Sequence, residues 1–352
     1  MTEAVSPLEV SGASRRISIR TIQTASVFLL LVVLCLISSL QTDTFFTWTN
    51  LVDNLFTSAS YIGVMACGMT LVMIAGGFDL SVASMVAVCS VITVLVLKGL
   101  AGYGAWVAIP VAVIATTAAG TILGAINGVF VSYVGVNPFV VTLSTMLVFR
   151  GLALVITHGG QSIEVPMTLG SLFREVYWGR VPLFGSEYRL TIPILVFLGV
   201  FVVFHVFLRY TRFGHYVYAV GGNETASWLT GINTARIKAI TYTLSGLTCA
   251  LAAVVYTGMS NTAQAASYQG IEMVVIAAVI VGGTPLGGGS GNLWCTLNGL
   301  LLLSVIENLL TQFGIAEEYR NIVRGTLILM VVAIDVSVRR ANMRKRWRSK
   351  TC

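Results

Sequence analysis

The feature that most constrains this chain is a series of long apolar runs that recurs from Ile22 to Val338. A membrane-spanning helix needs about 20 mostly apolar residues. Hydrophobic residues make up 56% of the 352 residues and charged residues only 10%, whereas soluble domains carry about 25% charged residues. The sequence therefore predicts an all-α polytopic membrane protein with about ten spanning helices. The expected spans are 22–40, 56–76, 80–97, 106–133, 138–157, 190–208, 236–258, 270–283, 293–312 and 320–338.

The apolar runs follow one another without a linker rich in Pro, Ser or Gly. We therefore expect one transmembrane domain over residues 22–338, between an N-terminal tail at 1–21 and a basic C-terminal tail at 339–352. The run at 270–283 is short for a full span. Short or broken helices are thus expected where glycines interrupt the apolar pattern.

The distribution of Lys and Arg predicts the orientation. The two tails and the loop at 209–238 hold 14 of the 21 basic residues, and the connections on the opposite side hold five. Positive residues favour the cytoplasmic side, so both termini and the 209–238 loop are expected to be cytoplasmic. The loop at 158–189 is then outside, where it either docks a partner or lies on the membrane surface. The basic C-terminal tail suits anionic lipid rather than nucleic acid.

Motifs of enzymatic chemistry are absent from the sequence. Neither H-E-x-x-H, G-x-S-x-G nor the phosphate-binding G-x-x-x-x-G-K-[ST] occurs, and these are the patterns that place metal ligands, nucleophiles and nucleotide phosphates. His158 is expected outside, His205 at the end of a span and His215 inside, so the three histidines are not expected to lie together. The six cysteines form no C-x-x-C pair. We therefore expect no metal site, no cofactor, and no ATPase site in this chain.

A glycine pair followed by a carboxylate interrupts the apolar sequence between the second and third expected spans. A charged group at membrane depth is disfavoured by about 3 kcal/mol or more, and glycine permits a sharp turn or a close backbone approach. Asp79 could cap the third span by accepting the N–H of Ser81 or Val82, contact a substrate, or carry a proton. We favour capping and the geometry of a helix break. The residues assigned to this break are Gly76, Gly77, Phe78, Asp79 and Ser81.

A similar motif occurs later in the chain. G-G-F-D-L-S at 76–81 is echoed by G-G-T-P-L-G at 282–287, and each follows an outside-to-inside helix. Interrupted spans at matching positions indicate a transport site, although a match over six residues can also arise by chance. We predict that Gly282 and Gly283 form a second helix break beside the pathway.

The fourth expected span carries a small residue at every fourth position. Thr116, Gly120, Gly124 and Gly128 form one smooth stripe, along which another helix can approach closely. Asn127 lies beside this stripe and is expected to form an interhelical hydrogen bond, with a place along the pathway as its functional alternative.

Ionisable residues inside spans are the remaining candidates for chemistry. They are expected to face a partner or an aqueous cavity, or to reach the membrane surface. A proton-coupled transporter could use Asp79 or Glu307 as its carrier. The set consists of Asp79, Arg150, Glu272, Glu307 and Arg324.

The loop at 209–238 encodes a helix of about two turns. Asn223 is a suitable N-cap, Glu224 suits the positive helix start, and Gly231 is a suitable terminator. An isolated helix of this length is marginal in water, so neighbouring structure must hold it. It is either a lever inserted into a cytoplasmic partner or a surface helix with Trp228 in the membrane interface.

Four longer motifs identify the chain's relatives. They are A-C-G-M-T-L-V-M-I-A-G-G-F-D-L-S-V-A-S at 66–84, N-P-F-V-V-T-L-S-T-M at 137–146, T-R-F-G-H-Y-V-Y-A-V-G-G-N-E-T-A at 211–226 and A-A-V-I-V-G-G-T-P-L-G-G-G-S-G at 277–291. In this order they resemble the permease subunits of bacterial ATP-binding-cassette importers for ribose, xylose, arabinose and galactose. Phe78 and Ala83 depart from the common family pattern and look closer to arabinose permeases.

The resemblance implies an inner-membrane complex. Its expected partners are a second permease chain, as homodimer or heterodimer, a cytoplasmic ATP-binding subunit and a periplasmic sugar-binding protein. It also implies that the segment from Gly222 to Gly231 is a coupling helix docked on the ATPase. The chain is then a transport subunit rather than an enzyme, and a self-sufficient ion-coupled transporter using Asp79 is the alternative. The residues assigned to coupling are Gly222, Asn223, Glu224, Ala226, Leu229 and Gly231.

Overall fold

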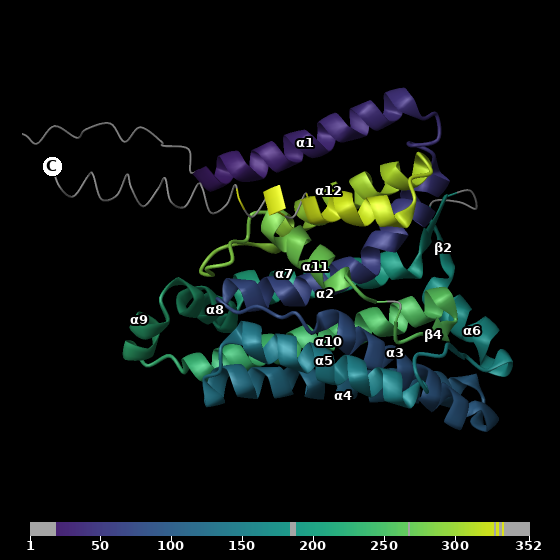
Figure 1. The fold of residues 1–352 in the computed structure, drawn as a ribbon, viewed down its shortest axis with the longest axis horizontal. Coiled ribbons are helices and arrows are strands. Elements are labelled where there is room, and N and C mark those ends of the chain that lie inside the picture. Colours follow the sequence, from purple (N-terminus) through teal and green to yellow (C-terminus); the bar gives the residue numbers. More distant parts are fainter. Residues whose placement is uncertain (1–18, 184–187, 267, 327–328, 331–332, 334–352) are drawn as a thin grey trace, which may run out of the picture.

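The computed structural model describes residues 19–183, 188–266, 268–326, 329–330 and 333. Nearly all of this part is helical (Figure 1). The α-helices are α1 Ile19–Gln41, α2 Thr57–Ile74, α3 Val82–Gly99, α4 Ala105–Val129, α5 Pro138–Ile156, α6 Met167–Trp178, α7 Ile192–Tyr210, α8 Arg212–Gly222, α9 Glu224–Leu229, α10 Thr234–Ser260, α11 Ile271–Val281 and α12 Leu293–Gln312. The π-helix η1 (Asn50–Phe56) precedes α2, the 3₁₀ turn η2 (Ala101–Tyr103) precedes α4, and the π-helix η3 (Phe130–Val134) follows α4.

Seven helices in the described part of the chain are long and apolar enough to span a membrane. They match seven of the ten expected spans. The other three are the short α11, α1, and the last expected span, and the last two are only partly described. α11 has only 11 residues, as the short run at 270–283 predicted, because it ends at the glycine pair. α1 has 23 residues, and the part of it whose side chains are described, Val27–Gln41, is apolar. The last expected span is helical over 320–326 and is only partly described beyond that point.

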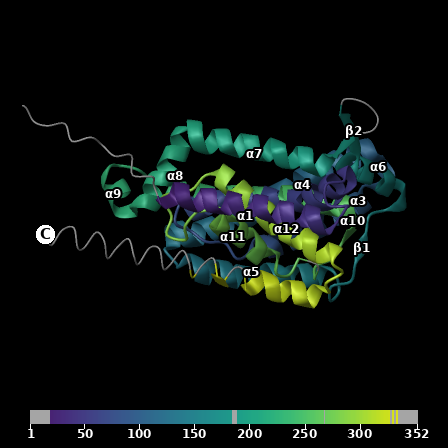
Figure 2. The same ribbon diagram turned by 90° about the horizontal axis from the view of Figure 1, so that it is seen from above.

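The long helices lie side by side in a bundle with two different ends. α8 and α9 project at one end, and α6 with the strands lies at the other (Figure 1). In the turned view α7 runs along one side of the bundle (Figure 2). The loop at 209–238 and the loop at 158–189 therefore occupy opposite ends, as the sequence predicted.

Two short antiparallel sheets are the exceptions to an all-α fold. β1 (Ile163–Glu164) pairs with β4 (Thr262–Ala263), and β2 (Arg180–Leu183) pairs with β3 (Tyr188–Thr191). Arg180 binds Asp53 at 3.0 Å, which ties the β2–β3 hairpin to η1. The predicted outside loop is thus a folded layer across one end of the bundle.

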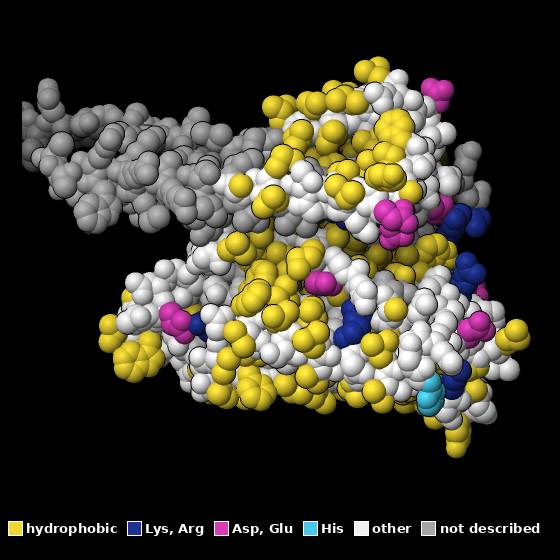
Figure 3. All heavy atoms as spheres, viewed as in Figure 1, with side chains coloured by type: hydrophobic (Ala, Val, Ile, Leu, Met, Phe, Trp, Pro, Cys, Tyr) yellow, Lys and Arg dark blue, Asp and Glu magenta, His cyan; other side chains and the backbone are white. Residues whose placement is uncertain are grey.

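The interior of the bundle is formed by α2, α3 and α10. Most residues of these helices are buried, whereas most residues of α4, α5, α7 and α12 are not. The outer helices nevertheless expose apolar side chains, such as Leu147 and Val155 on α5, and Figure 3 shows hydrophobic side chains over much of one face. An apolar exterior is what a helix bundle surrounded by lipid requires.

The predicted small-residue stripe packs α4 against α10. A methyl group added at Gly124 would lie 2.9 Å from the Cα of Gly246, and one added at Gly128 would lie 2.7 Å from the carbonyl oxygen of Ala239. Thr116 also contacts α3, through a 2.8 Å hydrogen bond with Thr93. The stripe is therefore a helix-packing surface, which confirms the prediction.

Candidate functional site

The first glycine break reverses the chain between α2 and α3. Gly76 has a φ of 81°, a left-handed value that favours glycine, and Gly77 donates its N–H to Val72 at 2.8 Å. Together they terminate α2 and direct the chain back into the bundle. The predicted helix break is confirmed as structure.

Asp79 lies in this reversal and is completely buried. Its carboxylate accepts the backbone N–H of Ser81 at 2.9 Å, the Ser81 hydroxyl at 2.7 Å and the Ser245 hydroxyl at 3.4 Å. Asn127 donates its side-chain amide to the Ser81 hydroxyl at 2.7 Å. The expected bond from the Ser81 N–H is confirmed, and so is the interhelical role of Asn127. This cluster joins the start of α3 to α4 and α10.

Tyr242 on α10 holds the turn from the other side. Its hydroxyl accepts the N–H of Phe78 at 3.1 Å and donates to the Phe78 carbonyl at 3.0 Å. A methyl group added at Gly77 would lie 2.7 Å from the same hydroxyl. Sequence reasoning missed both Tyr242 and Ser245, because a polar residue within a long apolar helix gives no sign of which loop it meets.

The second glycine break separates α11 from α12. Gly283 has a φ of 108°, and a side chain at Gly282 would overlap the Cys295 carbonyl group on α12. Asn292 caps α12 by accepting the N–H of Cys295 at 2.8 Å. The chain thus reverses a second time, as the sequence echo predicted.

The two breaks meet at a point that also includes the end of α8. Gly289 donates its N–H to the Ile74 carbonyl at 2.8 Å, and a methyl group added at Gly288 would lie 2.7 Å from the Cα of Gly76. A side chain at Gly221 would overlap that same Ile74 carbonyl oxygen. We call the set formed by residues 74–76, 221–222 and 288–289 the glycine junction.

The glycines that meet in the glycine junction are not the ones that the sequence echo paired. The sequence echo aligned Gly76 and Gly77 with Gly282 and Gly283, whereas the backbone contact with the first break is made by Gly288 and Gly289. The run of glycines at 287–289 indicated that another backbone segment could pack closely against it. The sequence did not indicate which segment that is.

The short helix α9 begins one residue after the glycine junction. The Asn223 side chain accepts the N–H of Ala226 at 2.9 Å, and Gly231, with a φ of 87°, donates its N–H to the Trp228 carbonyl at 2.9 Å. Glu224 binds Lys238 of α10 at 2.5 Å. The predicted cap and terminator are confirmed, and the ion pair supplies part of the outside support that so short a helix needs.

α9 presents apolar side chains to its surroundings. Trp228 is 65% exposed and Leu229 is 71% exposed, at the projecting end of the bundle (Figure 1). Exposed large apolar side chains on one short, fixed helix are typical of an interaction surface. α9 therefore offers an exposed apolar surface two residues from the glycine junction.

Of the other ionisable residues predicted inside spans, Glu272 accepts the N–H of Gly270 at 3.2 Å with one oxygen, and its other oxygen is buried without a hydrogen-bond partner in the described part of the chain. Arg150 donates to the Ala265 carbonyl. Glu307 binds Arg320 at 2.9 Å and Arg324 at 2.6 Å. Among the described residues no group of three His, Cys, Asp or Glu side chains gathers as a metal site would require.

The chain was compared with known proteins. Residues 51–332 match the family described as "Branched-chain amino acid transport system / permease component". The ribose import permease protein RbsC of Escherichia coli K12 is 36% identical over 310 residues, which cover 88% of this chain and 92% of the relative. RbsC of Bacillus subtilis strain 168 is 35% identical over 311 residues, covering 88% and 91%.

A third relative is the L-arabinose transport system permease protein AraH of Escherichia coli K12. It is 31% identical over 312 residues, which cover 88% of each chain. No solved structure gives a significant match. Because the family match spans residues 51–332 and the relatives align over most of both chains, this chain belongs to the permease family described as branched-chain amino acid transport system permease components.

Proposed function

We propose that the chain is the transmembrane permease subunit of an ATP-driven importer, which moves a monosaccharide from the periplasm to the cytoplasm. The observation that carries the proposal is the position of α9. Its exposed Trp228 and Leu229 suit a cytoplasmic ATPase subunit, and only its N-cap, Asn223, separates its first residue from the glycine junction. A partner that grips α9 thereby acts on both helix breaks.

The coupling proposal rests on how tightly the glycine junction is packed. Backbone atoms of α2, α8 and the loop before α12 lie so close that a methyl group added at Gly221 or Gly289 would overlap its neighbours. Close-packed interiors transmit displacement because they have little free volume to absorb it. When α9 is displaced, the end of α2 and the loop before α12 therefore move with it, and the pathway beside them changes its access.

The proposed substrate is a sugar, and a pentose is favoured. The relatives named above are ribose and arabinose permeases, and a fructose import permease protein of Bifidobacterium longum is 30% identical. We give the higher identity to the ribose relatives more weight than the arabinose-like Phe78, which lies in the turn before α3, and Ala83, which lies in the first turn of α3. The complex we propose lies in the bacterial inner membrane, with cytoplasmic termini. Its other members are a second permease chain, an ATP-binding subunit and a periplasmic sugar-binding protein.

Reconstitution tests this function. The purified chain is placed in proteoliposomes with candidate ATPase and sugar-binding proteins, and ATP hydrolysis and uptake are measured with D-ribose, L-arabinose, D-xylose, D-galactose and D-fructose. We expect one sugar to stimulate both activities. If no combination of partners gives sugar-stimulated hydrolysis, the proposal is wrong.

The alternative is an ion-coupled transporter that uses Asp79. That carboxylate accepts three hydrogen bonds, from the backbone and hydroxyl of Ser81 and from Ser245, which favours a fixed anchoring role over proton carriage. The alternative predicts that the chain alone, in liposomes under a proton gradient, accumulates sugar. We expect no accumulation without the ATPase.

A further inference from the structure

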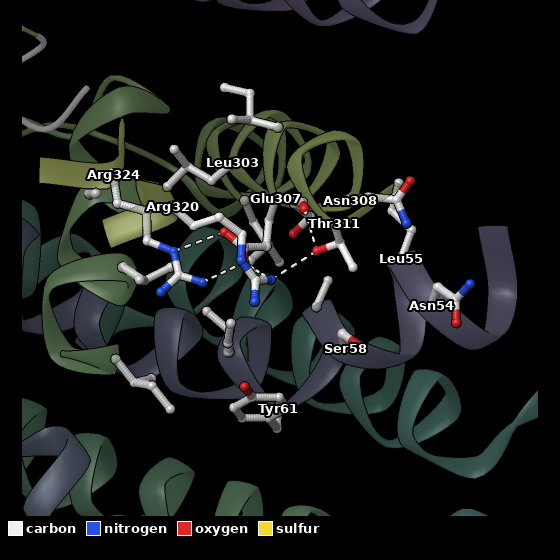
Figure 4. A pocket seen from close by; sticks show the side chains of 18 of the residues that line it. Asn54, Leu55, Ser58, Tyr61, Leu303, Glu307, Asn308, Thr311, Arg320 and Arg324 are labelled. Atoms are coloured by element: carbon white, nitrogen blue, oxygen red, sulfur yellow. Dashed lines mark hydrogen bonds and ion pairs between the residues drawn. The ribbon is translucent and has the colours of Figure 1, made fainter. Parts of the chain in front are cut away.

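A large cavity opens between the ends of helices that lie farthest from α9. It has a volume of about 470 Å³, and its lining comes from η1, the start of α2, α11, α12 and the segment at 320–324 (Figure 4). The charged side chains of this lining bind one another, since Glu307 pairs with both Arg320 and Arg324. A charged ligand would have to displace these ion pairs.

A smaller cavity lies at the opposite end of the bundle, where α7 meets α8 and the start of α12. Its volume is about 310 Å³, at the lower end of the range of about 300–1,000 Å³ that is usual for small-molecule sites. We call this cavity the basic pocket. The side chains that define it are His205, Arg209, His215, Tyr218, Asn292 and Trp294.

The positive charge of the basic pocket is not neutralised by the protein. No Asp or Glu lines the pocket, and Arg209 takes part in none of the ion pairs found among the described residues. Its guanidinium lies 5.6 Å from the centre of the Tyr210 ring, a contact that positions the charge and leaves it in place. A guanidinium matches the geometry of phosphate and carboxylate groups. The basic pocket therefore suits an anion.

His215 adds a second nitrogen to this site. Its Nδ1 donates to the Thr211 carbonyl at 2.8 Å, because a carbonyl oxygen can only accept. Nε2 is thus the ring nitrogen left for a ligand, and in the protonated form of the ring it is a donor.

Contacts between its three walls hold the basic pocket open. The Tyr218 hydroxyl donates to the Gly291 carbonyl at 2.7 Å, which joins α8 to the loop before α12. The Trp294 ring packs edge-on against His205 with ring centres 6.0 Å apart, which joins α12 to α7. A pocket that is already formed loses little conformational freedom when a ligand binds.

The basic pocket lies where a spanning helix reaches the membrane surface. α7 is long and apolar enough to cross a membrane, and Arg209 is its second-to-last residue. Tyr210 and Trp294 are both exposed here, and these two residue types are enriched at membrane–water interfaces. Basic pockets between spanning helices are typical sites for anionic lipid headgroups. The pocket is therefore at the level of the headgroups.

An exposed apolar stripe runs along α7 to the basic pocket. Leu198 and Val202 are 46% and 56% exposed. Together with His205 and Arg209 they follow the spacing i, i+4, i+7 and i+11, which places all four on one face of the helix. α7 runs along one side of the bundle (Figure 2), where lipid can reach this face. A free anion would leave the stripe uncovered, whereas a lipid acyl chain covers it.

We propose that the basic pocket binds the headgroup of an anionic phospholipid of the phosphatidylglycerol kind, from the leaflet that this end of the bundle faces. Arg209 pairs with the lipid phosphate, and protonated His215 donates Nε2–H to a phosphate oxygen. An acyl chain lies along Leu198 and Val202. A zwitterionic lipid fits less well, because its ammonium group finds no carboxylate in the lining. The orientation proposed above makes this the cytoplasmic leaflet.

Native mass spectrometry of the purified full chain in detergent tests the headgroup site. The chain is titrated separately with phosphatidylglycerol, phosphatidylcholine and inorganic phosphate. Arg209→Gln removes the charge of the pocket, and the matched control is Arg236→Gln, at an exposed arginine in the first turn of α10 and outside the pocket. We expect wild type and control to bind one phosphatidylglycerol roughly tenfold more tightly than phosphatidylcholine. Arg209→Gln should lose this preference, because hydrogen bonds to a charged group are the strong ones.

Thermal unfolding is an independent measurement of the same site. A ligand that binds only the folded chain raises its unfolding temperature. We expect phosphatidylglycerol to raise the unfolding temperature of wild type and of Arg236→Gln above the value in phosphatidylcholine. For Arg209→Gln the two lipids should give the same unfolding temperature.

Three outcomes would overturn the lipid site. Inorganic phosphate that binds wild type as tightly as phosphatidylglycerol would make the pocket an anion site without a lipid. Equal lipid binding by Arg209→Gln and Arg236→Gln would indicate diffuse attraction to a basic surface. Unchanged lipid binding by Arg209→Gln, with loss of the ATPase subunit or of a second permease chain from the purified complex, would make the pocket a protein contact. The lipid measurements need neither sugar nor ATP, so their result leaves the importer function to its own test.

Discussion

At the scale of single residues, the carboxylate of Asp79 is an anchor. It joins the start of α3 to α10 through the backbone and hydroxyl of Ser81 and the hydroxyl of Ser245. The N–H group of Ser81 is one of the donors that a helix start leaves without an intrahelical partner. Satisfying it inside a membrane protein matters because water is excluded there.

Replacing Asp79 by Asn tests whether charge or geometry is needed. The amide oxygen of Asn can still accept from Ser81, so we expect uptake within about twofold of wild type, whereas Asp79→Ala destabilises the chain by about 1–3 kcal/mol. Uptake and thermal unfolding in detergent measure the two effects. An inactive but stably folded Asp79→Asn chain would indicate that the charge itself is required.

Gly77→Val tests the geometry of the same turn, because a side chain at Gly77 crowds the Tyr242 hydroxyl. If Gly77→Val and Asp79→Asn are both fully active, the geometric role of this turn is wrong.

Two adjacent glycines provide a matched pair within the glycine junction. A side chain at Gly221 overlaps the Ile74 carbonyl oxygen, whereas one at Gly222 meets nothing within 4 Å. We expect Gly221→Ala to reduce ATP-driven uptake at least tenfold, because α8 must separate from α2 to make room. Gly222→Ala should retain uptake. Equal activity of the two variants in proteoliposomes would contradict the role of the glycine junction.

At the scale of elements, α9 shows how a helix of six residues keeps its shape. Its cap and terminator are local, while Lys238 of α10 holds Glu224. Its most exposed side chains are therefore free to contact a partner without contributing to the helix's own stability. Binding and folding can be separated by mutation at this element.

Leu229→Asp tests partner binding by α9 without changing the contacts that fold it. Because Leu229 is 71% exposed, we expect unchanged membrane insertion and thermal unfolding. A carboxylate in an apolar contact should uncouple ATP hydrolysis from uptake and weaken co-purification of the ATPase subunit. Thr230→Ser at the neighbouring exposed position is the control. Normal uptake by Leu229→Asp would contradict the assignment of α9 as the coupling helix.

At the scale of the whole molecule, the two ends of the bundle carry different features. α9 and the glycine junction occupy one end, and the cavity opens near the other. α2 and α11 connect the two, because each reaches from the cavity to a glycine break.

The two ends are predicted to face opposite sides of the membrane. In a chain with Cys35, Cys295 and Cys352 replaced by Ser, we expect Thr230→Cys to react with a membrane-impermeant maleimide only from the cytoplasmic side. Gln161→Cys should react only from the periplasmic side. Labelling of intact cells and of inverted vesicles measures both. Reaction of both thiols from one side would contradict the orientation.

Local sequence rules predicted much of the framework. Asn223 and Gly231 bound α9 as predicted, because a cap depends on residues three or four positions away. The spacing of small residues on α4 predicted a packing stripe but not its partner, α10. Gly221 and Tyr242 were not singled out, because each acts through a residue that is distant in the chain.

The sequence by itself determined the class of protein, the positions of most long helices and the two glycine breaks, since hydrophobic length and glycine conformation are properties of short segments. Only the tertiary structure decided that Ile74, Gly221 and Gly289 meet, and that the far ends of α2 and α11 line one cavity. The physical reason is that close backbone approach and cavity lining depend on how whole helices pack. No local pattern encodes the neighbour that a helix will find.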